Sequence, residues 1–187
     1  MSDLSLQLRQ AASQLPVSSY FDTALYRREM ATIFQQGPRY LGHELSVPHV
    51  GDYFALAQEG EGRALLRTPR GVELISNVCR HRQAVILKGR GSTQDGPGSG
   101  GNIVCPLHRW TYSAGGGAAP AGTLLGAPHF AKDPCLNLNN YPLQEWNGLL
   151  FQGGPGTVNV AAQLAGMGPR ADLDFSGHVL DLSLIHI

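Results

Sequence analysis

The sequence has little charge, no long apolar run and few cysteines. Lysine and arginine number 14 and are balanced by 14 aspartates and glutamates, so the formal net charge is zero. A neutral chain without a basic stripe argues against nucleic acid and anionic membranes as partners. No apolar run approaches the roughly 18 residues that a membrane span needs. The amino terminus also lacks the basic and apolar regions of a secretory signal. These absences predict a cytoplasmic protein that binds neither nucleic acid nor membrane.

The cysteines do not form a disulfide pattern. There are three, Cys79, Cys105 and Cys135, which is an odd number. Each of the first two has a histidine two or three residues further on, a spacing of metal ligands rather than of disulfide partners. Cys135 stands apart from any histidine, and we interpret it as an ordinary free thiol. This usage of cysteine favours a reducing compartment.

Glycine and proline are abundant, at 24 and 12 residues, and they separate short apolar runs. Asn147-Gly148 is a favoured two-residue hairpin turn between two such runs. Regular short strands with such turns predict a mainly β fold, a small antiparallel β-sandwich or barrel. The predicted strands are 52–58, 63–68, 72–78, 83–87, 102–105, 110–113, 143–146 and 149–152.

Two helices are expected before the first strand. The first runs from Asp3, which can cap it, to Leu15. The second is predicted within residues 22–36, where a glycine-proline pair ends it. We interpret residues 1–37 as an N-terminal helical segment used for packing or oligomer contacts. The second helix is expected to turn four apolar side chains inward: Leu25, Met30, Ile33 and Phe34.

Glycine-rich segments divide the rest of the chain. Residues 89–101 are interpreted as a flexible surface excursion, because no Gly-Lys-Ser/Thr follows that would make them a phosphate loop. Residues 115–122 are interpreted as a second flexible hairpin tip. Gly153-Gly154-Pro155-Gly156 marks a boundary, so the β domain is predicted to be 38–155. A short helix is expected at 158–164.

Two short motifs carry the chemistry. Cys79 and His81 have the spacing C-x-H, and Cys105 and His108 have the spacing C-x-x-H. Two thiolates and two imidazoles can hold a [2Fe–2S] cluster of the Rieske kind, with two cysteines on one iron and two histidines on the other. Neutral imidazoles raise the potential to roughly −150 to +300 mV, against about −400 mV for plant-type ferredoxins with cysteine ligands only. The motifs therefore predict a one-electron relay.

A Cys2His2 zinc site is the alternative for the same four residues. Zinc fingers group cysteine with cysteine and histidine with histidine, whereas each motif here mixes the two, which favours the cluster. His129 is interpreted as a loop residue, since four ligands are already supplied.

Residues beside the motifs have supporting roles. Trp110 is expected to shield one side of the cluster from water, and Tyr112 to donate a hydrogen bond to a cysteine sulfur. Arg80, Arg82 and Arg109 flank the ligands. They form either a solvated rim that offsets the charge of the cluster or a docking surface for an acidic redox partner.

With these motifs the sequence resembles the α subunits of the Rieske non-haem iron, aromatic ring-hydroxylating oxygenases. The similarity covers roughly residues 20–181 and its ligand motifs are highly specific. The resemblance implies that Cys79 and Cys105 ligate one iron and that His81 and His108 ligate the other. Arg109 stands where the family usually has glycine. The matching segments are Asn77 to Arg82, Cys105 to Tyr112, Gly126-Ala127-Pro128 and Trp146 to Phe151.

The resemblance implies an oxidoreductase, a Rieske-type mono- or dioxygenase large subunit. Electrons from an NAD(P)H-dependent reductase or a ferredoxin would pass through the cluster to a mononuclear Fe(II). That iron activates O2 to hydroxylate an aromatic or other small organic substrate. The family also implies head-to-tail homotrimers. The alternative is a stand-alone Rieske-type ferredoxin, an electron carrier that resembles the central β part alone.

The family's mononuclear iron needs two histidines and one carboxylate from a second domain, and no D-x-x-H-x3–4-H motif is present. We therefore expect residues 156–181 to be a linker and the start of a missing α+β catalytic domain. The ending 182–187 is interpreted as a non-native tail. The chain is then a C-terminally truncated fragment that is inactive alone.

Overall fold

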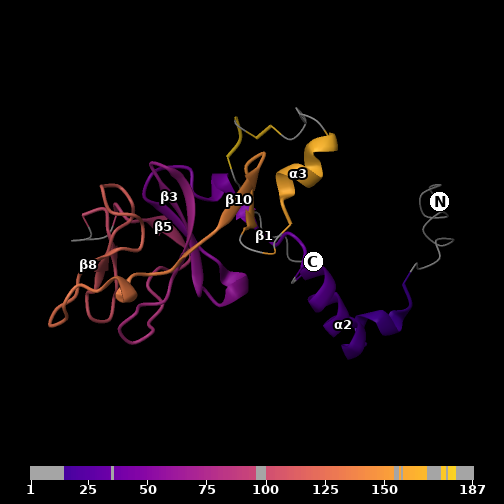
Figure 1. Cartoon of the computed structure of the whole chain (residues 1–187), viewed down its shortest axis with the longest axis horizontal. Helices are drawn as coiled ribbons and strands as arrows, with labels where there is room; N and C mark the ends of the chain where they lie inside the picture. The colour runs from indigo at the N-terminus through magenta and orange to yellow at the C-terminus, as the bar shows by residue number, and fades with distance from the viewer. Residues whose placement is uncertain are drawn as a thin grey trace, which may run out of the picture. The chain divides into compact units, whose positions relative to one another are not determined.

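Figure 1 shows the computed structural model of the chain, which describes residues 15–34, 36–95, 100–153, 156, 158–167, 174–175 and 177–179. The chain divides into two compact units, Met1–Gly37 and Pro38–Ile187. Most of the first expected helix and all of the 182–187 tail lie outside the described residues. None of the helices in the described part is long and apolar enough to cross a membrane.

The described part of the first unit is helical. A 3-10 turn, Val17–Tyr20, precedes α2 (Thr23–Glu29), and α2 continues into a π-helical turn, Met30–Phe34. The carboxylate of Asp22 caps α2 by accepting hydrogen bonds from Ala24 N and from the next amide. The predicted start of the second helix is therefore confirmed.

The apolar side chains of this helix remain at the surface. Ile33 and Phe34, which were expected to face inward, are 60% and 58% exposed. Leu25 and Met30 are half-buried. No residue of α2 or of the π-helical turn is buried, so the expectation of an inward apolar face is wrong for its second half.

The second unit is mainly β, as predicted, and every strand pair is antiparallel. Its described strands form three sheets with the orders β1-β11-β10, β5-β2-β3-β4-β9 and β6-β7-β8. The strands are β1 (Tyr40–His43), β2 (Asp52–Ala55), β3 (Arg63–Thr68), β4 (Gly71–Ser76), β5 (Arg90–Ser92), β6 (Ile103–Val104), β7 (Thr111–Tyr112), β8 (Leu124–Gly126), β9 (Asn140–Tyr141), β10 (Leu143–Trp146) and β11 (Leu149–Gln152).

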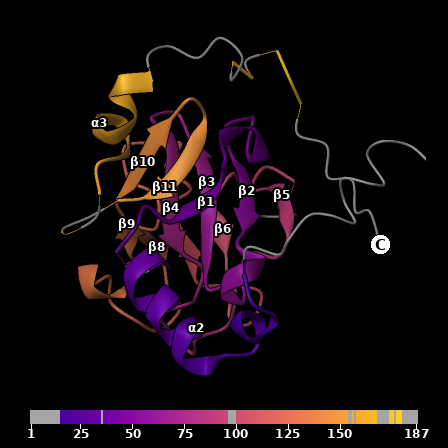
Figure 2. The same cartoon turned by 90° about the vertical axis from the view of Figure 1, so that its right-hand side faces the viewer.

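The three sheets lie in layers, with the five-stranded sheet in the middle. Side chains alternate between the two faces of a strand, and β3 and β4 bury both faces. Leu65 and Leu74 join a core with Leu150 of β11, whereas Leu66 and Ile75 join a second core. Figure 2 shows β1, β10 and β11 in front of β3 and β4. This layering is that of a sandwich.

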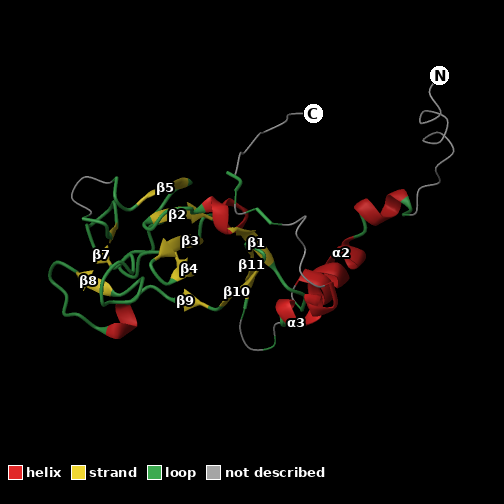
Figure 3. Ribbon diagram, turned by 90° about the horizontal axis from the view of Figure 1, so that it is seen from above, coloured by secondary structure: helices red, strands yellow, loops and turns green. Residues whose placement is uncertain are grey.

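The second core holds the cysteines of the two motifs. Besides Leu66 and Ile75 it contains Cys79 and Cys105, together with Trp110, Tyr112 and Leu124 of the β6-β7-β8 side. Figures 1 and 3 place β8 at the end of the β unit opposite β10. The motifs therefore belong to the layer that is farther from β1, β10 and β11.

The predicted strand bounds are correct where turn residues lie on both sides of the strand. Strands β3, β10 and β11 have the predicted bounds, and the Asn147-Gly148 turn joins the last two. Strands β2, β4, β6 and β7 were also predicted, with bounds that differ by one to three residues at an end. Strands β1, β8 and β9 were not predicted.

Two predictions around the ligand motifs are wrong. Residues 83–87 form no strand, and only Val85 makes an isolated bridge, to Val78. The supposed surface excursion 89–101 contains β5, which pairs with β2 as the edge of the five-stranded sheet. The short helix is α3 (Val160–Leu164), capped by Asn159, followed by a 3-10 turn, Ala165–Met167.

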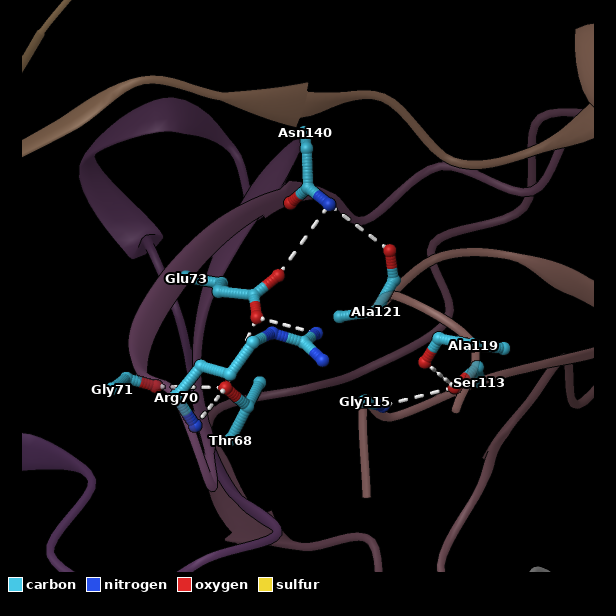
Figure 4. Close-up of polar contacts among 9 residues, drawn as sticks. All are labelled: Thr68, Arg70, Gly71, Glu73, Ser113, Gly115, Ala119, Ala121 and Asn140. Carbon is cyan, nitrogen blue, oxygen red and sulfur yellow. Dashed lines mark hydrogen bonds and ion pairs between the residues drawn. The ribbon is translucent and has the colours of Figure 1, made fainter. Parts of the chain in front are cut away.

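Side-chain hydrogen bonds connect the β7–β8 hairpin to the middle sheet, as Figure 4 shows. The carboxylate of Glu73 on β4 accepts hydrogen bonds from Thr68 and Arg70, both at 3.0 Å, and from Asn140 at 3.5 Å. The Asn140 amide also donates to the carbonyl of Ala121 at 3.0 Å. Ala121 lies near the C-terminal end of the predicted hairpin tip 115–122. The hydrogen bond from Asn140 therefore fixes that end of the segment to the middle sheet.

Candidate metal centre

The two motifs occupy two loops of the same design. The first ligand loop (79–84) follows β4, and the second ligand loop (105–110) joins β6 to β7. In the first, the Gln83 amide donates to the Cys79 carbonyl at 3.0 Å, and the Cys79 amide donates to the Ala84 carbonyl at 2.9 Å. In the second, the Arg109 and Cys105 amides make the equivalent bonds, at 3.0 and 2.8 Å.

Both loops turn through a residue in the left-handed conformation. Gln83 has φ +56° and Arg109 has φ +61°, and each is the fourth residue after its cysteine. This conformation favours glycine, so both positions hold a strained backbone that only the surrounding hydrogen bonds maintain. The glycine that the resembled family usually has at position 109 would adopt this conformation without strain, whereas Arg109 does not.

The two thiols lie together in the core. Cys79 is 1% exposed and Cys105 is 2% exposed, and both are free. Burial raises the pKa of the Cys79 thiol, and the neighbouring Cys105 raises that pKa further, whereas hydrogen bonding to Tyr112 opposes the change. Two buried thiols this close, both without a disulfide, are suited to share one metal ion.

Tyr112 connects the two loops, as the sequence predicted. Its hydroxyl oxygen is 3.3 Å from the Cys79 sulfur. The same oxygen accepts a hydrogen bond from the Arg80 amide at 3.2 Å, so the hydroxyl proton is left to donate to the sulfur. Burial and the Cys79 thiol raise the pKa of Tyr112 far above its usual range, which keeps the phenol protonated as a donor.

The two histidines meet on the outer side of the thiols. The rings of His81 and His108 have centroids 4.7 Å apart. The Trp110 indole, 2% exposed, lies parallel to the His81 ring with centroids 4.9 Å apart and planes 5° apart. The expectation that Trp110 shields one side of the site agrees with this stacking.

An unpartnered nitrogen provides the test of whether this site fits a cluster. Nδ1 of His81 is buried and has no hydrogen-bond partner within the described part of the chain. Desolvation lowers the pKa of His81, and His108 and Arg82 lower it further, so the ring is neutral and offers a lone pair. A metal-ion bond would satisfy this nitrogen, and the four donors match a Rieske [2Fe–2S] cluster.

A single-ion site finds less support. Among the described residues, no group of three or more His, Cys, Asp or Glu side chains is arranged to hold one metal ion. Each iron of a Rieske cluster has only two protein ligands. The absence of a three-residue group is therefore compatible with a cluster. The four predicted ligands thus form a sulfur pair and a nitrogen pair.

Phe130 belongs to the site although the sequence did not single it out. Its ring contacts both His81 and Trp110 edge to face, with centroids 5.5 and 5.0 Å away. Phe130 follows Gly126-Ala127-Pro128, a segment that matched the family, and that proximity was the one available signal. Together, Trp110 and Phe130 cover part of the ring of His81, which is half-buried, whereas His108 is exposed.

Other singled-out residues lie outside the pairs. Cys135 is exposed, and its carbonyl accepts a hydrogen bond from Arg80 at 3.3 Å. His129 is an exposed loop residue with φ +67°. His43 caps the 3-10 turn Glu44–Ser46 by accepting from the Leu45 amide.

Comparison with known proteins gives one family. A family model described as "Rieske [2Fe-2S] domain" matches residues 38–137. A putrescine 2-hydroxylase of Ralstonia nicotianae is 55% identical over 188 residues, covering 100% of this chain and 47% of the relative. A putrescine 2-hydroxylase of Bordetella bronchiseptica is 48% identical and covers 94% of this chain and 41% of the relative. The chain thus spans less than half the length of these curated relatives.

Solved structures share the fold. Naphthalene 1,2-dioxygenase from Rhodococcus sp. superposes with a TM-score of 0.61 at 25% identity, over 92% of this chain and 38% of that one. A quaternary ammonium Rieske monooxygenase superposes with a TM-score of 0.58 at 20% identity, over 82% of this chain and 43% of that one. At 20% identity the second similarity concerns the fold alone.

Proposed function

Because the chain belongs to the Rieske [2Fe–2S] domain family, we propose that it is the electron-transfer part of a Rieske non-haem iron oxygenase. The observation that carries the proposal is the pairing of buried thiols on one side and of neighbouring imidazoles on the other. Cys79 and Cys105 would hold one iron, and His81 and His108 the other. The cluster supplies one-electron transfer at a moderate potential.

The residues of the chain have separate tasks in this function. Tyr112 holds a proton against the Cys79 sulfur and so withdraws charge from it. Trp110 and Phe130 exclude water from the face of His81. His108 is exposed and forms the route by which an electron reaches or leaves the surface.

We propose that the complete protein hydroxylates a small aliphatic amine such as putrescine. Two relatives named for that activity match over 94% or more of this chain. A biphenyl dioxygenase subunit from Rhodococcus jostii is 28% identical over 62% of the chain, so the aromatic members are more distant. The mononuclear Fe(II) and the substrate pocket would be supplied by a catalytic domain beyond the residues of this chain.

The stand-alone carrier is the weaker candidate. A carrier of that kind would resemble the central β part alone, whereas the Ralstonia relative matches the whole chain, including the helical segment before residue 38. The proposed domains remain the helical segment 1–37, the Rieske domain 38–155 and a linker that begins at 156.

The relay requires an electron donor, which would be a reductase or a ferredoxin. The resemblance to the ring-hydroxylating oxygenases supports homotrimers of the complete protein. The ligand thiols have to stay reduced until iron binds, which suits a compartment such as the cytoplasm.

Spectroscopy of the reconstituted 187-residue chain tests the ligand assignment. Anaerobic loading with iron and sulfide should give about two irons per chain and, after reduction by dithionite, an EPR signal. Cys79→Ser, Cys105→Ser and His81→Ala should each abolish that signal. Cys135→Ser and His129→Ala are matched controls and should keep it. A colourless, EPR-silent chain that binds zinc instead would contradict the cluster.

The substrate proposal needs the complete protein. With a reductase, NADH, O2 and putrescine, mass spectrometry should detect a product that is heavier by one oxygen atom. Biphenyl is the comparison substrate. Turnover of biphenyl but not of putrescine would reject the amine while leaving the oxygenase function standing.

A further inference from the structure

The two ligand loops are supported in different ways. The second ligand loop leaves β6 and enters β7, and these two strands pair with each other directly beneath it. In the described part of the chain, the first ligand loop has no such pair of strands. The segment that follows it, residues 83–87, makes a single β-bridge, between Val85 and Val78. Another contact is therefore needed to hold the two ends of the first loop together.

The side chain of Asn77 makes that contact. Asn77 lies between β4 and Cys79 and is 1% exposed. Its amide nitrogen donates to the Leu87 carbonyl at 2.7 Å, and its amide oxygen accepts from the Leu87 N–H at 2.8 Å. One side chain thus pairs with both backbone groups of Leu87, as the backbone of a neighbouring residue does in an antiparallel ladder.

The same carboxamide also binds a third segment. Its nitrogen donates to the carbonyl of Glu61 at 2.8 Å. These three bonds need a carboxamide, because it combines two N–H donors with an acceptor oxygen. A polar side chain that is fully buried is costly unless such bonds are made. The arrangement around Asn77 therefore tolerates little change in geometry.

Two further bonds hold the segment that returns from the first loop. The backbone carbonyl of Asn77 accepts from the Ile86 amide at 3.0 Å. The carboxylate of Glu61 accepts from the Gly89 amide at 3.0 Å. Residues 86–89 are therefore fixed to the residue that stands two positions before the ligand Cys79.

This support decides how the first loop meets the second. The Cys79 sulfur lies 3.3 Å from the hydroxyl of Tyr112 on β7. The His81 ring lies parallel to the indole of Trp110, which belongs to the second loop. Both contacts join the two loops, so both depend on the first loop being held at one position.

We propose that Asn77 is a positioning residue for the cluster, whose carboxamide replaces strand pairing and holds Cys79 and His81 against the second loop. The proposal rests on the proposed electron-transfer function and adds a residue that controls the potential and the lifetime of the cluster. Without the carboxamide, the Cys79 sulfur moves away from the Tyr112 hydroxyl, and the reduced state loses that hydrogen bond.

Redox titration of the reconstituted 187-residue chain tests the effect on the potential. Asn77→Ser shortens the side chain, and Asn77→Leu keeps its approximate volume without polar atoms, so neither adds charge. Both should lower the reduction potential, by no more than Tyr112→Phe does. In a Tyr112→Phe background, Asn77→Ser should lower it no further, because the hydrogen bond to the sulfur is already absent. A residue that only stabilises the fold would not show this dependence on Tyr112.

The rate of cluster loss is the second measurement. Bleaching of the visible absorbance in the presence of an iron chelator should be about tenfold faster for Asn77→Ser, since the first loop opens more often. Thr68→Val is the matched control. Thr68 is 1% exposed and hydrogen-bonds to Gly71 and Glu73 at the opposite end of β4. Its substitution should lower stability but leave the potential and the rate of cluster loss unchanged.

Hydrogen exchange tests the unaltered chain. Leu87 lies outside the strands, yet its amide should be protected to within about tenfold of the amides that pair β3 with β4. Mass spectrometry of the cluster-loaded chain measures this protection. Rapid exchange at Leu87 would overturn the proposal even if both Asn77 variants failed to fold.

Three other results would also overturn it. One is a wild-type potential and rate of cluster loss in both Asn77 variants. Another is an equal decrease in potential with and without the Tyr112 hydroxyl, and the last is the same set of effects in Thr68→Val. The EPR signal of the reduced wild-type chain reports separately on the electron-transfer function. Its absence rejects that function, whereas its presence with unaffected Asn77 variants rejects the positioning role alone.

Discussion

The Trp110 indole lies flat against the His81 imidazole, with planes 5° apart and centroids separated by 4.9 Å. His108, by contrast, meets His81 at 69° and is exposed. One imidazole of the pair is therefore half-buried against aromatic rings and the other faces solvent. This asymmetry gives the site a protected side and an accessible side.

Trp110 should support the fold as well as the site. Trp110→Ala removes an indole that is 2% exposed, so we expect the free energy of unfolding to fall by about 3–5 kcal/mol. Trp110→Phe keeps part of the stacking and should cost less. Urea unfolding followed by circular dichroism measures both values. A loss below about 1 kcal/mol for the alanine variant would mean that the indole is not packed as described.

Tyr112 should raise the reduction potential of the cluster. Tyr112→Phe removes the hydroxyl at 3.3 Å from the Cys79 sulfur and leaves the ring in the core. A hydrogen bond to the sulfur stabilises the more negative, reduced state by about 1 kcal/mol, which corresponds to about 40 mV for one electron. Redox titration monitored by EPR should show a decrease of that size. An unchanged or higher potential would place the hydroxyl elsewhere.

Gly115 is needed where the β7–β8 hairpin approaches the middle sheet. A Cβ there would lie 2.9 Å from the Thr68 methyl group, and φ is +78°. We expect Gly115→Ala to lower the unfolding free energy by about 2 kcal/mol or more through strain and overpacking. The neighbouring Gly116, whose Cβ would meet nothing within 4 Å, is the matched control. Equal effects of the two substitutions in thermal unfolding would argue against this close contact.

The ion pair between Glu59 and Arg63 should make stability depend on pH. Arg63 Nε donates to Glu59 at 2.6 Å, and this hydrogen bond lowers the pKa of Glu59 below its usual value of 4.5. Because the folded-state pKa is the lower one, the stabilisation is complete above about pH 4.5 and is lost as the pH falls through the lowered pKa. Glu59→Gln should cost about 1–2 kcal/mol at pH 7.

The difference between wild type and Glu59→Gln should shrink as the pH falls from 5 towards 3. Urea unfolding at a series of pH values measures it. Glu145, an exposed carboxylate on β10, is the control, and Glu145→Gln should change stability little at any pH. A constant difference for Glu59→Gln across this range would show that the carboxylate charge does not stabilise the fold.

The sequence by itself was sufficient to predict local features of the structure. A Cys and a His in each short motif predicted a Rieske-type cluster, and Asn147-Gly148 predicted the turn of a hairpin. Such features depend on residues that are close in the chain, because turn geometry and metal-ligand spacing are local. The strand β3 was found for the same reason, since turn residues precede and follow it.

The edge strand β5 escaped prediction for a physical reason. β5 consists of Arg90, Gly91 and Ser92, which have no apolar alternation, and it is a strand because β2 offers it backbone partners. The sequence pattern of residues 83–87 predicted a strand. In the structure this segment follows the first ligand loop and makes a single β-bridge, between Val85 and Val78. Pairing between distant segments, rather than local preference, decided both cases.

For this protein the sequence determined which four side chains could hold a cluster, since cysteine and histidine at those spacings carry that chemistry wherever the loops lie. Only the tertiary structure decided that His81 packs against Trp110 and Phe130 while His108 is exposed. Those properties arise from segments that are remote in the chain and brought together by the packing of the sheets. Packing of that kind depends on the whole core and cannot be derived from any one motif.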